Sequence, residues 1–379
     1  MRVTVRSFAK INLGLCIGPV RPDKFHELRT VYQTIALHDV LHLEVVRGSG
    51  IEIRSADPRV PTDESNTCYK TLAKAMAALN AKGKVVLEIE KRLPVQGGLG
   101  GASGNAVSAI IALEKALKKT LSGPERLRIA AEVGSDLPLF LVGGTSLGVS
   151  HGEEVYPLAD LPATSCVVTT PEIGVSTPKA FADWDELMAR TETAAELRSA
   201  WTAGGGRPHV SLGDAGGVAP AIDRAHSGDA SEARDTRKLT SCAPSDRINE
   251  FGRMLSVWLS GVPKKALQKK VVRRPSSGVP AVGRGRAETL LLDLVRTGIE
   301  NDFETVVFSQ YPALREVKRV LERSGAFYAS LSGSGSALYG LYRTRAQAEQ
   351  AARKLNRAGI AATATTTLTR SQYWKKLSI

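Results

Sequence analysis

The chain has 379 residues, of which 42% are hydrophobic and 23% are charged. This length allows two domains with sizeable cores, and the composition is that of an ordinary globular protein. No apolar run approaches the roughly 18 residues of a membrane span, and the first residues lack the apolar stretch of a secretion signal. We therefore expect a cytoplasmic protein without a membrane association.

The formal net charge of +13 raises the question of a polyanionic partner. Residues 190–287 contain 17 Lys and Arg against 9 Asp and Glu, so this stretch carries +8 of the excess. The remaining charge is typical of an enzyme with anionic substrates. Aromatic residues make up 5% of the chain, and no strand shows the interleaved aromatics of an RNA-binding surface. Nucleic acid is therefore not favoured as a partner.

The four cysteines are scattered, with no closely spaced pair: Cys16, Cys68, Cys166 and Cys242. This spacing argues against both a disulfide framework and a zinc site.

Apolar periodicity in the first 150 residues predicts alternating strands and helices. Strands are expected over 1–18, 41–45, 51–53, 84–90 and 145–149, and helices over 67–81, 105–118 and 124–133. The short turn sequence Arg47-Gly48-Ser49-Gly50 between the strands at 41–45 and 51–53 predicts that these two form a hairpin. A polar turn is expected at 21–28.

The second half begins with a predicted strand at 164–170 and continues differently. Residues 190–243 are dominated by Gly, Ala, Ser, Thr, Arg and Asp with little periodicity, which predicts a mobile insertion. Helices are then expected over 246–259, 289–297, 313–323 and 345–357, a basic connector over 261–287, a strand-turn-strand over 327–342, and a strand over 360–368. Helix, two strands, helix and strand is the pattern of a ferredoxin-like half.

Residues 93–105 are rich in glycine and connect the strand at 84–90 to the helix at 105–118. A strand, a flexible loop and a helix start bring free N–H groups and the positive end of the helix dipole together, which favours a phosphate-binding loop. A tight turn with glycines at positive φ is the alternative. The loop is neither a P-loop, since no Gly-Lys-Ser/Thr follows, nor a GxGxxG loop, since Ser103 replaces the last glycine.

Two charged residues outside this loop also stand out. Lys10 is a cation in an apolar strand, which is costly to bury unless it is paired; an edge-strand lysine is the alternative. Asp136 follows a predicted helix end and precedes Pro138. It is either a catalytic carboxylate or a turn residue. The sequence alone leaves both pairs of alternatives open.

Three patterns, taken together and in this order, resemble the GHMP family of small-molecule kinases: residues 9–13 (Ala-Lys-Ile-Asn-Leu), the loop at 94–105, and residues 331–336 (Leu-Ser-Gly-Ser-Gly-Ser). Further matches narrow the resemblance to members that phosphorylate a cytidyl alcohol, at 25–28, 134–140, 152–153, 175–181 and 301–304. The resemblance covers about 1–185 and 287–368. It implies an α+β protein with a ribosomal S5 domain 2-like N-terminal domain, 1–160, and a ferredoxin-like C-terminal domain, 161–379, which would contain the insertion at 190–243.

The resemblance also implies an ATP-dependent kinase that uses Mg²⁺, with metal ligands that the sequence does not identify. Asp136 would be the general base, and Lys10 would lie beside it. The ATP phosphates would bind to the loop and the helix start, with Ser103 near the β and γ oxygens or the ion. The implied ATP-binding residues are Pro94, Gly97, Gly98, Leu99, Gly100, Gly101, Ala102, Ser103 and Gly104.

The implied substrate site is a small-molecule site for the cytidyl alcohol. Asn12 would lie beside the substrate, His26 would recognise cytosine, and Phe25 and Phe181 would stack on the base, although a lone Phe is more often a core residue. A second glycine turn, formed by Gly333, Ser334 and Gly335, would close the site; its simpler role is a turn between two strands.

Some positions depart from the family pattern. Gln96, Ala102, Gly104, Phe25 and Ser135 stand where other residues are common. None of these changes removes a proposed catalytic group. The details of phosphate contact depend on Gln96, Ala102 and Gly104.

Two alternatives compete with this hypothesis. One is a GHMP kinase for homoserine, mevalonate or a sugar, against which Phe25, His26 and Phe181 argue. The other is a non-catalytic nucleotide- or RNA-binding protein that uses the basic stretch at 190–287, against which Lys10 and Asp136 argue. Either a monomer or a homodimer fits the sequence.

Overall fold

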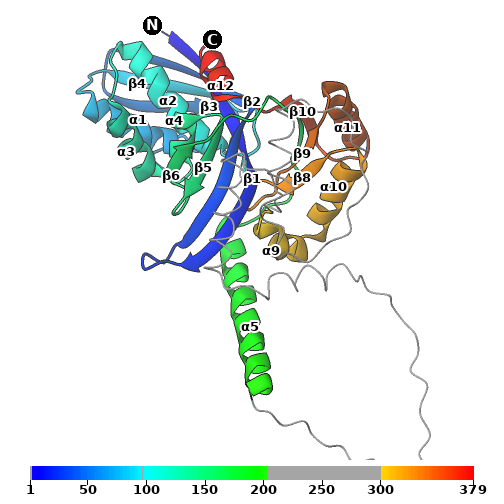
Figure 1. Cartoon of the computed structure of the whole chain (residues 1–379). Helices are drawn as coiled ribbons and strands as arrows, with labels where there is room; N and C mark the ends of the chain where they lie inside the picture. Colours follow the sequence, from blue (N-terminus) through cyan, green and yellow to red (C-terminus); the bar gives the residue numbers. More distant parts are fainter. Residues whose placement is uncertain (1, 96, 204–299) are drawn as a thin grey trace, which may run out of the picture.

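The computed structural model describes residues 2–95, 97–203 and 300–379, and the side chains of all of these except 192–203. Two β-sheets with their helices lie side by side, and the long helix α5 (Thr177–Ala203) extends from the region where they meet (Figure 1). Strand β1 (Arg2–Val20) and strand β2 (His26–Val46) are long enough to contribute to both halves. The functional residues lie along these two strands and the loops next to them.

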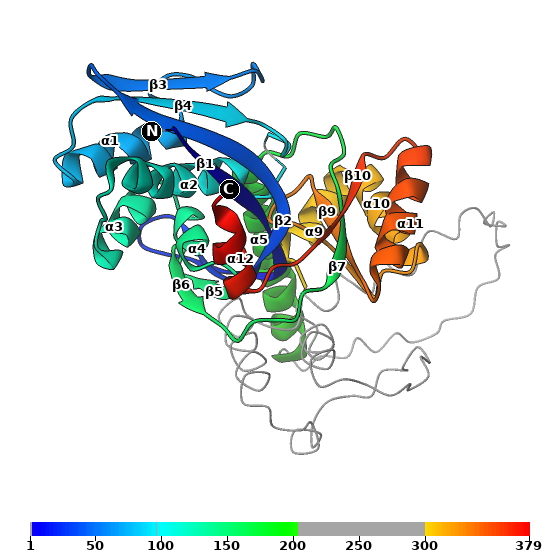
Figure 2. The ribbon, with the colours of Figure 1, turned by 90° about the horizontal axis from the view of Figure 1, so that it is seen from above.

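The N-terminal sheet has the strand order β3-β4-β2-β5-β6, and β1 pairs with β2 alone. Its other strands are β3 (Gly50–Ser55), β4 (Lys84–Glu90), β5 (Thr145–Val149) and β6 (Glu154–Pro157). Helices lie against one face of this sheet (Figure 2): α1 (Thr67–Ala78), α2 (Gly101–Leu117), α3 (Gly123–Val133) and α4 (Leu137–Val142). Alternate apolar residues of the strands and the apolar side of α2 form the core between sheet and helices.

The hairpin predicted between residues 41–45 and 51–53 is wrong. β4 lies between these segments, because it pairs antiparallel with β2 and parallel with β3. Apolar alternation identifies a strand with one buried face, but it does not identify the strand's partner. The chain leaves β2 through a short turn and returns one strand further out. The position between β2 and β3 is occupied by β4, which follows α1 in the chain.

The C-terminal sheet is antiparallel with the order β10-β7-β9-β8. Its strands are β7 (Ser165–Thr169), β8 (Tyr328–Leu331), β9 (Leu338–Tyr342) and β10 (Ala362–Thr366), and helices α9 (Phe303–Gln310), α10 (Pro312–Arg323) and α11 (Arg345–Arg357) pack with it. In chain order this arrangement reads 4-1-3-2, the ferredoxin-like order. The predicted helix at 345–357 is confirmed, and Thr344 caps it through a capping box.

A shared apolar core joins the two halves. β1 and β2 contribute Ile11, Leu13 and Ile35, which pack against residues of β7 and β9 such as Val168 and Tyr339. Leu99, from the glycine loop, is 1% exposed and belongs to the same core. The glycine loop therefore lies where the two halves meet.

Several boundaries differ from the sequence-based expectations. The helix expected at 105–118 begins at Gly101, inside the glycine loop. α5 continues to Ala203, so the insertion predicted at 190–243 does not begin at 190. The remainder of that insertion, the predicted helices at 246–259 and 289–297, and the connector at 261–287 lie outside the described residues.

Four short elements and the long helix α5 are not predicted from the sequence; the short ones are α4, β6, α9 and α12 (Arg370–Leu377). α12 leaves the C-terminal sheet and packs into the N-terminal core, where Tyr373 is 1% exposed and its hydroxyl donates to the Phe140 carbonyl at 2.7 Å. The boundary at residues 160 and 161 stays a prediction.

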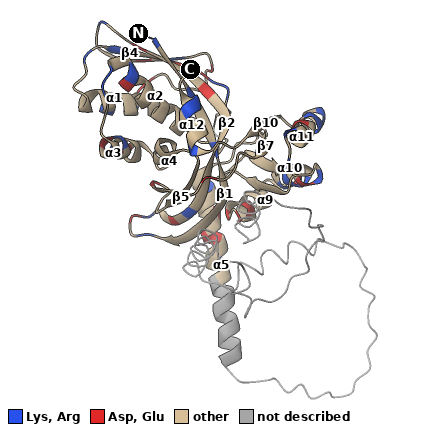
Figure 3. Ribbon diagram, turned by 45° about the horizontal axis from the view of Figure 1, so that its top comes forward, with Lys and Arg blue, Asp and Glu red and all other residues tan. Residues whose placement is uncertain are grey.

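Among the helices that the structure describes, none has the length and apolar character needed to span a bilayer. On α10 and α11, acidic and basic residues lie close to one another (Figure 3). The basic stretch at 190–287 lies almost entirely outside the described residues.

Candidate active site

Lys10 and Asp136 lie together where the two halves meet. The Lys10 side chain is 4% exposed, and its Nζ lies 3.6 Å from Asp136 Oδ2 and donates to Asn12 Oδ1 at 2.8 Å. β1 has a strand partner on one side only, and the Lys10 N–H on the other side donates to the Leu99 carbonyl of the glycine loop at 2.9 Å. Lys10 is thus on an edge strand, but its ammonium group is buried and paired.

Asp136 precedes α4 at the N-cap position, yet its side chain does not cap the helix. It is 37% exposed, so the carboxylate is accessible to a ligand. α3 ends just before it and Pro138 lies in the first turn of α4, which fixes the backbone on both sides. The turn geometry holds the carboxylate near Lys10 and leaves its oxygens available for chemistry.

Tyr32 completes this cluster, and sequence reasoning missed it. Its hydroxyl donates to Asp136 Oδ1 at 3.2 Å, and its ring lies under Lys10 Nζ at 5.6 Å. Burial, together with the Asp136 carboxylate, raises the pKa of Tyr32 well above its usual value, so the hydroxyl remains a donor. Only the register of β1 against β2, in which Tyr32 is opposite Asn12, could have revealed it.

The glycine loop ends in a helix start without a side-chain cap. Gly100, at φ 68°, occupies the N-cap position of α2, and among the described residues no side chain accepts a hydrogen bond from the N–H groups of the first turn. The N–H groups there are therefore available to an anion. Close packing also requires glycine at two positions. A Cβ on Gly98 would lie 2.2 Å from the Ser332 carbonyl oxygen, and a Cβ on Gly104 would lie 2.9 Å from the Phe8 carbonyl oxygen. The turn geometry and the anion site thus coexist.

The second glycine turn lies directly against the first. Ser332 Oγ donates to the Gly98 carbonyl at 3.0 Å, and the Ala337 N–H donates to the Gly97 carbonyl at 3.1 Å. A Cβ on Gly333 would lie 3.6 Å from Lys10 Nζ. The two turns from opposite halves of the molecule therefore meet next to Lys10.

Asn301, to which the sequence assigned no role, holds the second turn in place. Its buried amide donates to the carbonyls of Leu331 and Gly333 at 2.9 and 2.7 Å. Thr177, at the start of α5, is hydrogen-bonded to Ser334 through their hydroxyls at 2.7 Å. These contacts connect the turn to α9 and α5.

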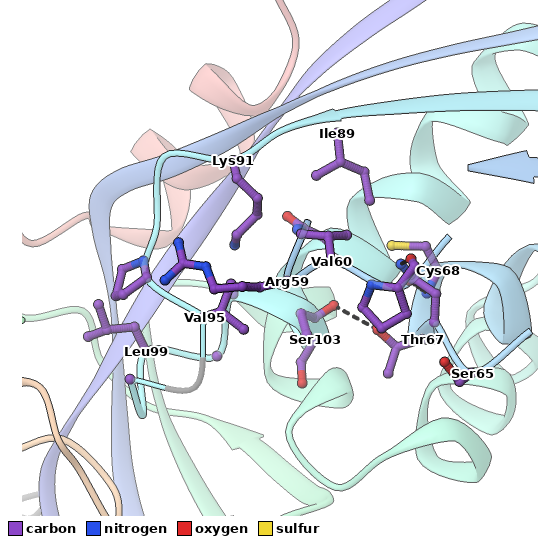
Figure 4. A pocket seen from close by; sticks show the side chains of 18 residues that line it. Arg59, Val60, Ser65, Thr67, Cys68, Ile89, Lys91, Val95, Leu99 and Ser103 are labelled. Carbon is purple, nitrogen blue, oxygen red and sulfur yellow. Dashed lines mark hydrogen bonds between the residues drawn. The ribbon is translucent and has the colours of Figure 1, made fainter. Parts of the chain in front are cut away.

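A cavity of about 390 Å³ opens beside the start of α2 (Figure 4). The ATP-binding residues predicted from the sequence contribute Pro94, Gly97, Leu99, Gly100, Gly101, Ala102 and Ser103 to its wall. The wall also includes the apolar residues Val60 and Ile89 and the polar residues Lys91, Asn66 and Thr67. An apolar cavity with few polar groups next to an anion site suits a nucleotide.

The predicted cytosine-binding residues lie near the β1–β2 turn and α5. The His26 and Phe181 rings are stacked, with centroids 5.0 Å apart and planes at 9°. His26 Nε2 lies 3.1 Å from Asp185 Oδ1, and its Nδ1 lies 3.0 Å from the Gly18 carbonyl oxygen. The structure thus brings His26 and Phe181 together.

Phe25 lies apart from that pair. It is 60% exposed, and its ring packs against His151 with centroids 5.0 Å apart. The structure does not place Phe25 opposite Phe181. In the described residues, no group of three or more His, Cys, Asp or Glu forms a metal cluster.

Comparison with known proteins gives a consistent result. The model of the GHMP kinases N terminal domain matches residues 66–144, and that of the GHMP kinases C terminal matches residues 283–361. A protein of Solibacter usitatus named 4-diphosphocytidyl-2-C-methyl-D-erythritol kinase is 32% identical over 341 residues, which cover 90% of this chain and 81% of that protein. A protein of the same name from Synechococcus elongatus is 30% identical over 360 residues, which cover 94% of this chain and 91% of that protein.

Solved structures agree. A crystal structure of 4-(cytidine 5'-diphospho)-2C-methyl-D-erythritol kinase superposes with a TM-score of 0.61 at 25% identity, covering 97% of this chain and 99% of the other. A homoserine kinase from Cytophaga hutchinsonii has a TM-score of 0.58 at 16% identity, covering 97% and 95%, which shows a common fold alone. The predicted two-domain fold class is confirmed.

Proposed function

The chain belongs to the GHMP kinase family, and we propose that it transfers the γ-phosphoryl group of ATP to the 2-hydroxyl group of 4-diphosphocytidyl-2-C-methyl-D-erythritol. The observation that carries this proposal is the meeting of Lys10, Asp136 and both glycine turns at one point. The names of the relatives that span most of the chain supply the substrate. The homoserine kinase is less similar and supports the fold only.

Asp136 is the group suited to accept the proton of the substrate hydroxyl. The hydroxyl oxygen attacks the γ-phosphorus, the bond to the β-phosphate oxygen breaks, and the proton passes to a carboxylate oxygen of Asp136 while ADP leaves. Lys10, with Nζ 3.6 Å from Asp136 Oδ2, pairs with the carboxylate and offsets negative charge on the reacting oxygen. Tyr32 holds Oδ1 of the carboxylate, which leaves Oδ2 toward Lys10.

The ATP phosphates fit the uncapped start of α2. The N–H groups of its first turn and the helix dipole favour negative charge there. The adjoining cavity, with its apolar walls, accommodates the nucleoside. The glycine turn at 333–335 lies across the junction, where it limits access of water to the reacting groups.

Mg²⁺ fits this site as a cation carried with the nucleotide. A kinase Mg²⁺ ion commonly binds substrate phosphates and only one or two protein oxygens, so a cluster of three carboxylates is not needed. Ser103, in the first turn of α2 and in the cavity wall, would supply a hydroxyl oxygen. The bound ion would neutralise charge on the phosphoryl group.

The cytidyl group is assigned to the region of His26 and Phe181. Thr177, hydrogen-bonded to the second glycine turn, begins α5, and Phe181 follows one helical turn later. A base that stacks on Phe181 would thus lie beside the reaction site, and Asn12, bonded to Lys10, would face the alcohol. Phe25, 60% exposed with its ring against His151, is not assigned to the base.

The proposal is tested by coupled measurement of ADP formation with a panel of alcohols. We expect turnover with the cytidyl alcohol and none above background with homoserine, mevalonate or a sugar. Turnover with one of these and not with the cytidyl alcohol would refute the substrate assignment. In Asp136→Asn, kcat should fall about 10²–10⁴-fold, as loss of a general base does, while ATP binding measured by calorimetry persists.

A further inference from the structure

Asp39 is a buried carboxylate to which the proposed reaction assigns no role. It lies in β2, is 0% exposed, and accepts four hydrogen bonds. Oδ1 accepts from the N–H groups of Arg92 and Leu93, both at 2.7 Å. Oδ2 accepts from Lys91 Nζ at 2.5 Å and from Asn105 Nδ2 at 3.0 Å. All four donors lie at or beside the ends of the glycine loop.

These contacts fix both ends of that loop on one side chain. Arg92 directly precedes the loop at 93–105, Leu93 is its first residue, and Asn105, in α2, is its last. A loop rich in glycine has much conformational freedom to lose. Tethering both ends to a rigid strand limits that freedom before a ligand arrives, which favours binding.

Asp39 also places a cation at the helix start. The Lys91 side chain is 7% exposed, lines the cavity, and its Nζ lies 3.2 Å from the position that a Cβ on Gly101 would occupy. Gly101 is the first residue of α2, so the ammonium group adds to the positive end of the helix dipole. Without Asp39, this buried ammonium group would have no carboxylate within the distance of an ion pair among the described residues.

The third consequence concerns Asn105. A carboxylate accepts hydrogen bonds only, so it selects the NH₂ side of the amide. Asn105 is 4% exposed and lines the same cavity, and its Oδ1 is buried without a hydrogen-bond partner among the described residues. An unpartnered buried acceptor in a cavity wall is costly unless a ligand donates to it.

We propose that Asp39 is a positioning residue for the nucleotide: through Lys91, Asn105 and the loop ends, it sets the affinity for ATP. It contacts neither the reacting hydroxyl nor the phosphoryl group. The inference rests on the proposed function only in taking ATP as the nucleotide. It does not depend on which alcohol is phosphorylated.

The test is Asp39→Asn, with Glu114→Gln as the matched control. The amide introduced by Asp39→Asn keeps the shape of the side chain, but its NH₂ group meets the donors of Lys91 or Asn105. Glu114 is also a buried carboxylate, bonded to the Leu121 N–H at 2.7 Å and to Arg126 at 2.9 Å, but it lies at the far end of α2. The two variants thus lose comparable contacts near opposite ends of one helix.

ATP binding is measured by calorimetry in the absence of any alcohol, and the KM values for ATP and for the alcohol are measured separately. Loss of a hydrogen bond to a charged group weakens a binding equilibrium about ten- to a hundredfold. We therefore expect Asp39→Asn to raise the Kd and the KM for ATP by at least about tenfold. The KM for the alcohol should stay within about twofold, because none of the groups that Asp39 holds belongs to the proposed alcohol site. Glu114→Gln should bind ATP as the wild type does.

Wild-type ATP affinity in Asp39→Asn would overturn the inference, and so would an equal loss in Glu114→Gln, because that result indicates general destabilisation. If Asp39→Asn does not fold, Asn105→Ala removes one tether and the unpartnered oxygen, and unchanged ATP affinity in that variant would overturn the inference. A wild type that binds no ATP overturns both the inference and the proposed function. A wild type that binds ATP but does not phosphorylate the cytidyl alcohol overturns only the substrate assignment.

Discussion

Replacing Tyr32 with phenylalanine removes a single hydroxyl group from the reaction site. The ring has no room to move, because a Cβ on Gly148 or Gly152 would lie 2.4 or 2.5 Å from Tyr32 atoms. The hydroxyl is one of two groups within reach of the Asp136 carboxylate, the other being Lys10, among the described residues. We expect Tyr32→Phe to lower kcat about fivefold and to leave both KM values unchanged.

The magnitude follows from the geometry. A hydrogen bond to a charged group is worth about 1.5–3 kcal/mol. The bond from Tyr32 to Asp136 is 3.2 Å long, beyond the usual range for O–H···O, and the carboxylate is 37% exposed, so water replaces part of the lost interaction. We therefore assign about 1 kcal/mol, and since about 1.36 kcal/mol corresponds to a tenfold change in rate, kcat falls about fivefold.

The assay is initial-rate ADP formation at saturating ATP and alcohol, with Tyr373→Phe as the control. Tyr373 is also buried and also loses one hydrogen bond in this variant, but its hydroxyl donates to the Phe140 carbonyl and not to the Asp136 carboxylate. Because the raised pKa of Tyr32 keeps its hydroxyl protonated, the ratio of the wild-type rate to the Tyr32→Phe rate should be constant between about pH 6 and pH 9. If Tyr32→Phe raised only a KM value, or lowered kcat more than about a thousandfold, the reasoning would be refuted.

Three further substitutions test the junction of the two halves. Lys10→Met should lower kcat at least about a hundredfold, because the buried partner of Asp136 is lost, and the initial-rate assay checks this. Gly98→Ala should cost about 1–3 kcal/mol of stability from its positive φ alone, and the clash with the Ser332 carbonyl should also abolish turnover; thermal unfolding and ADP formation report the two effects, and wild-type values for both would contradict the close packing. Asn301→Ala, which removes two hydrogen bonds that the buried amide donates and one that it accepts from the Phe303 N–H, should lower stability by about 2–3 kcal/mol in urea unfolding, and a change below about 0.5 kcal/mol would show that Asn301 does not support the second turn.

Local patterns predict much of the fold. The helix at 345–357 is predictable because its N-cap, its apolar spacing and its terminal glycine all lie within one short segment. The ferredoxin-like half follows from the order of its elements. The catalytic role of Lys10 follows only from the family resemblance, because a lysine in an apolar strand fits an edge strand equally well. Each of these signals depends on residues that are neighbours in the sequence.

The remainder depends on contacts between distant segments. β4 enters the sheet between β2 and β3, although residues 56–83 separate it from β3 and only a short turn joins β2 to β3. Tyr32 and Asp136 are 104 residues apart, and nothing near either one indicates the other. Likewise, Phe25 and Phe181 are both aromatic, but only the packing of α5 decides that Phe181 meets His26.

The position of α12 has a consequence for biosynthesis. Phe8, in β1, has its ring packed against Tyr373 of α12, with centroids 5.5 Å apart. At about 5–20 residues per second, a ribosome takes on the order of 20–70 s to proceed from one of these residues to the other. Throughout that interval the apolar surface around Phe8 and Phe140 lacks its final cover. The N-terminal half is therefore completed only after α12 has been synthesised, and the nascent chain exposes this surface until then.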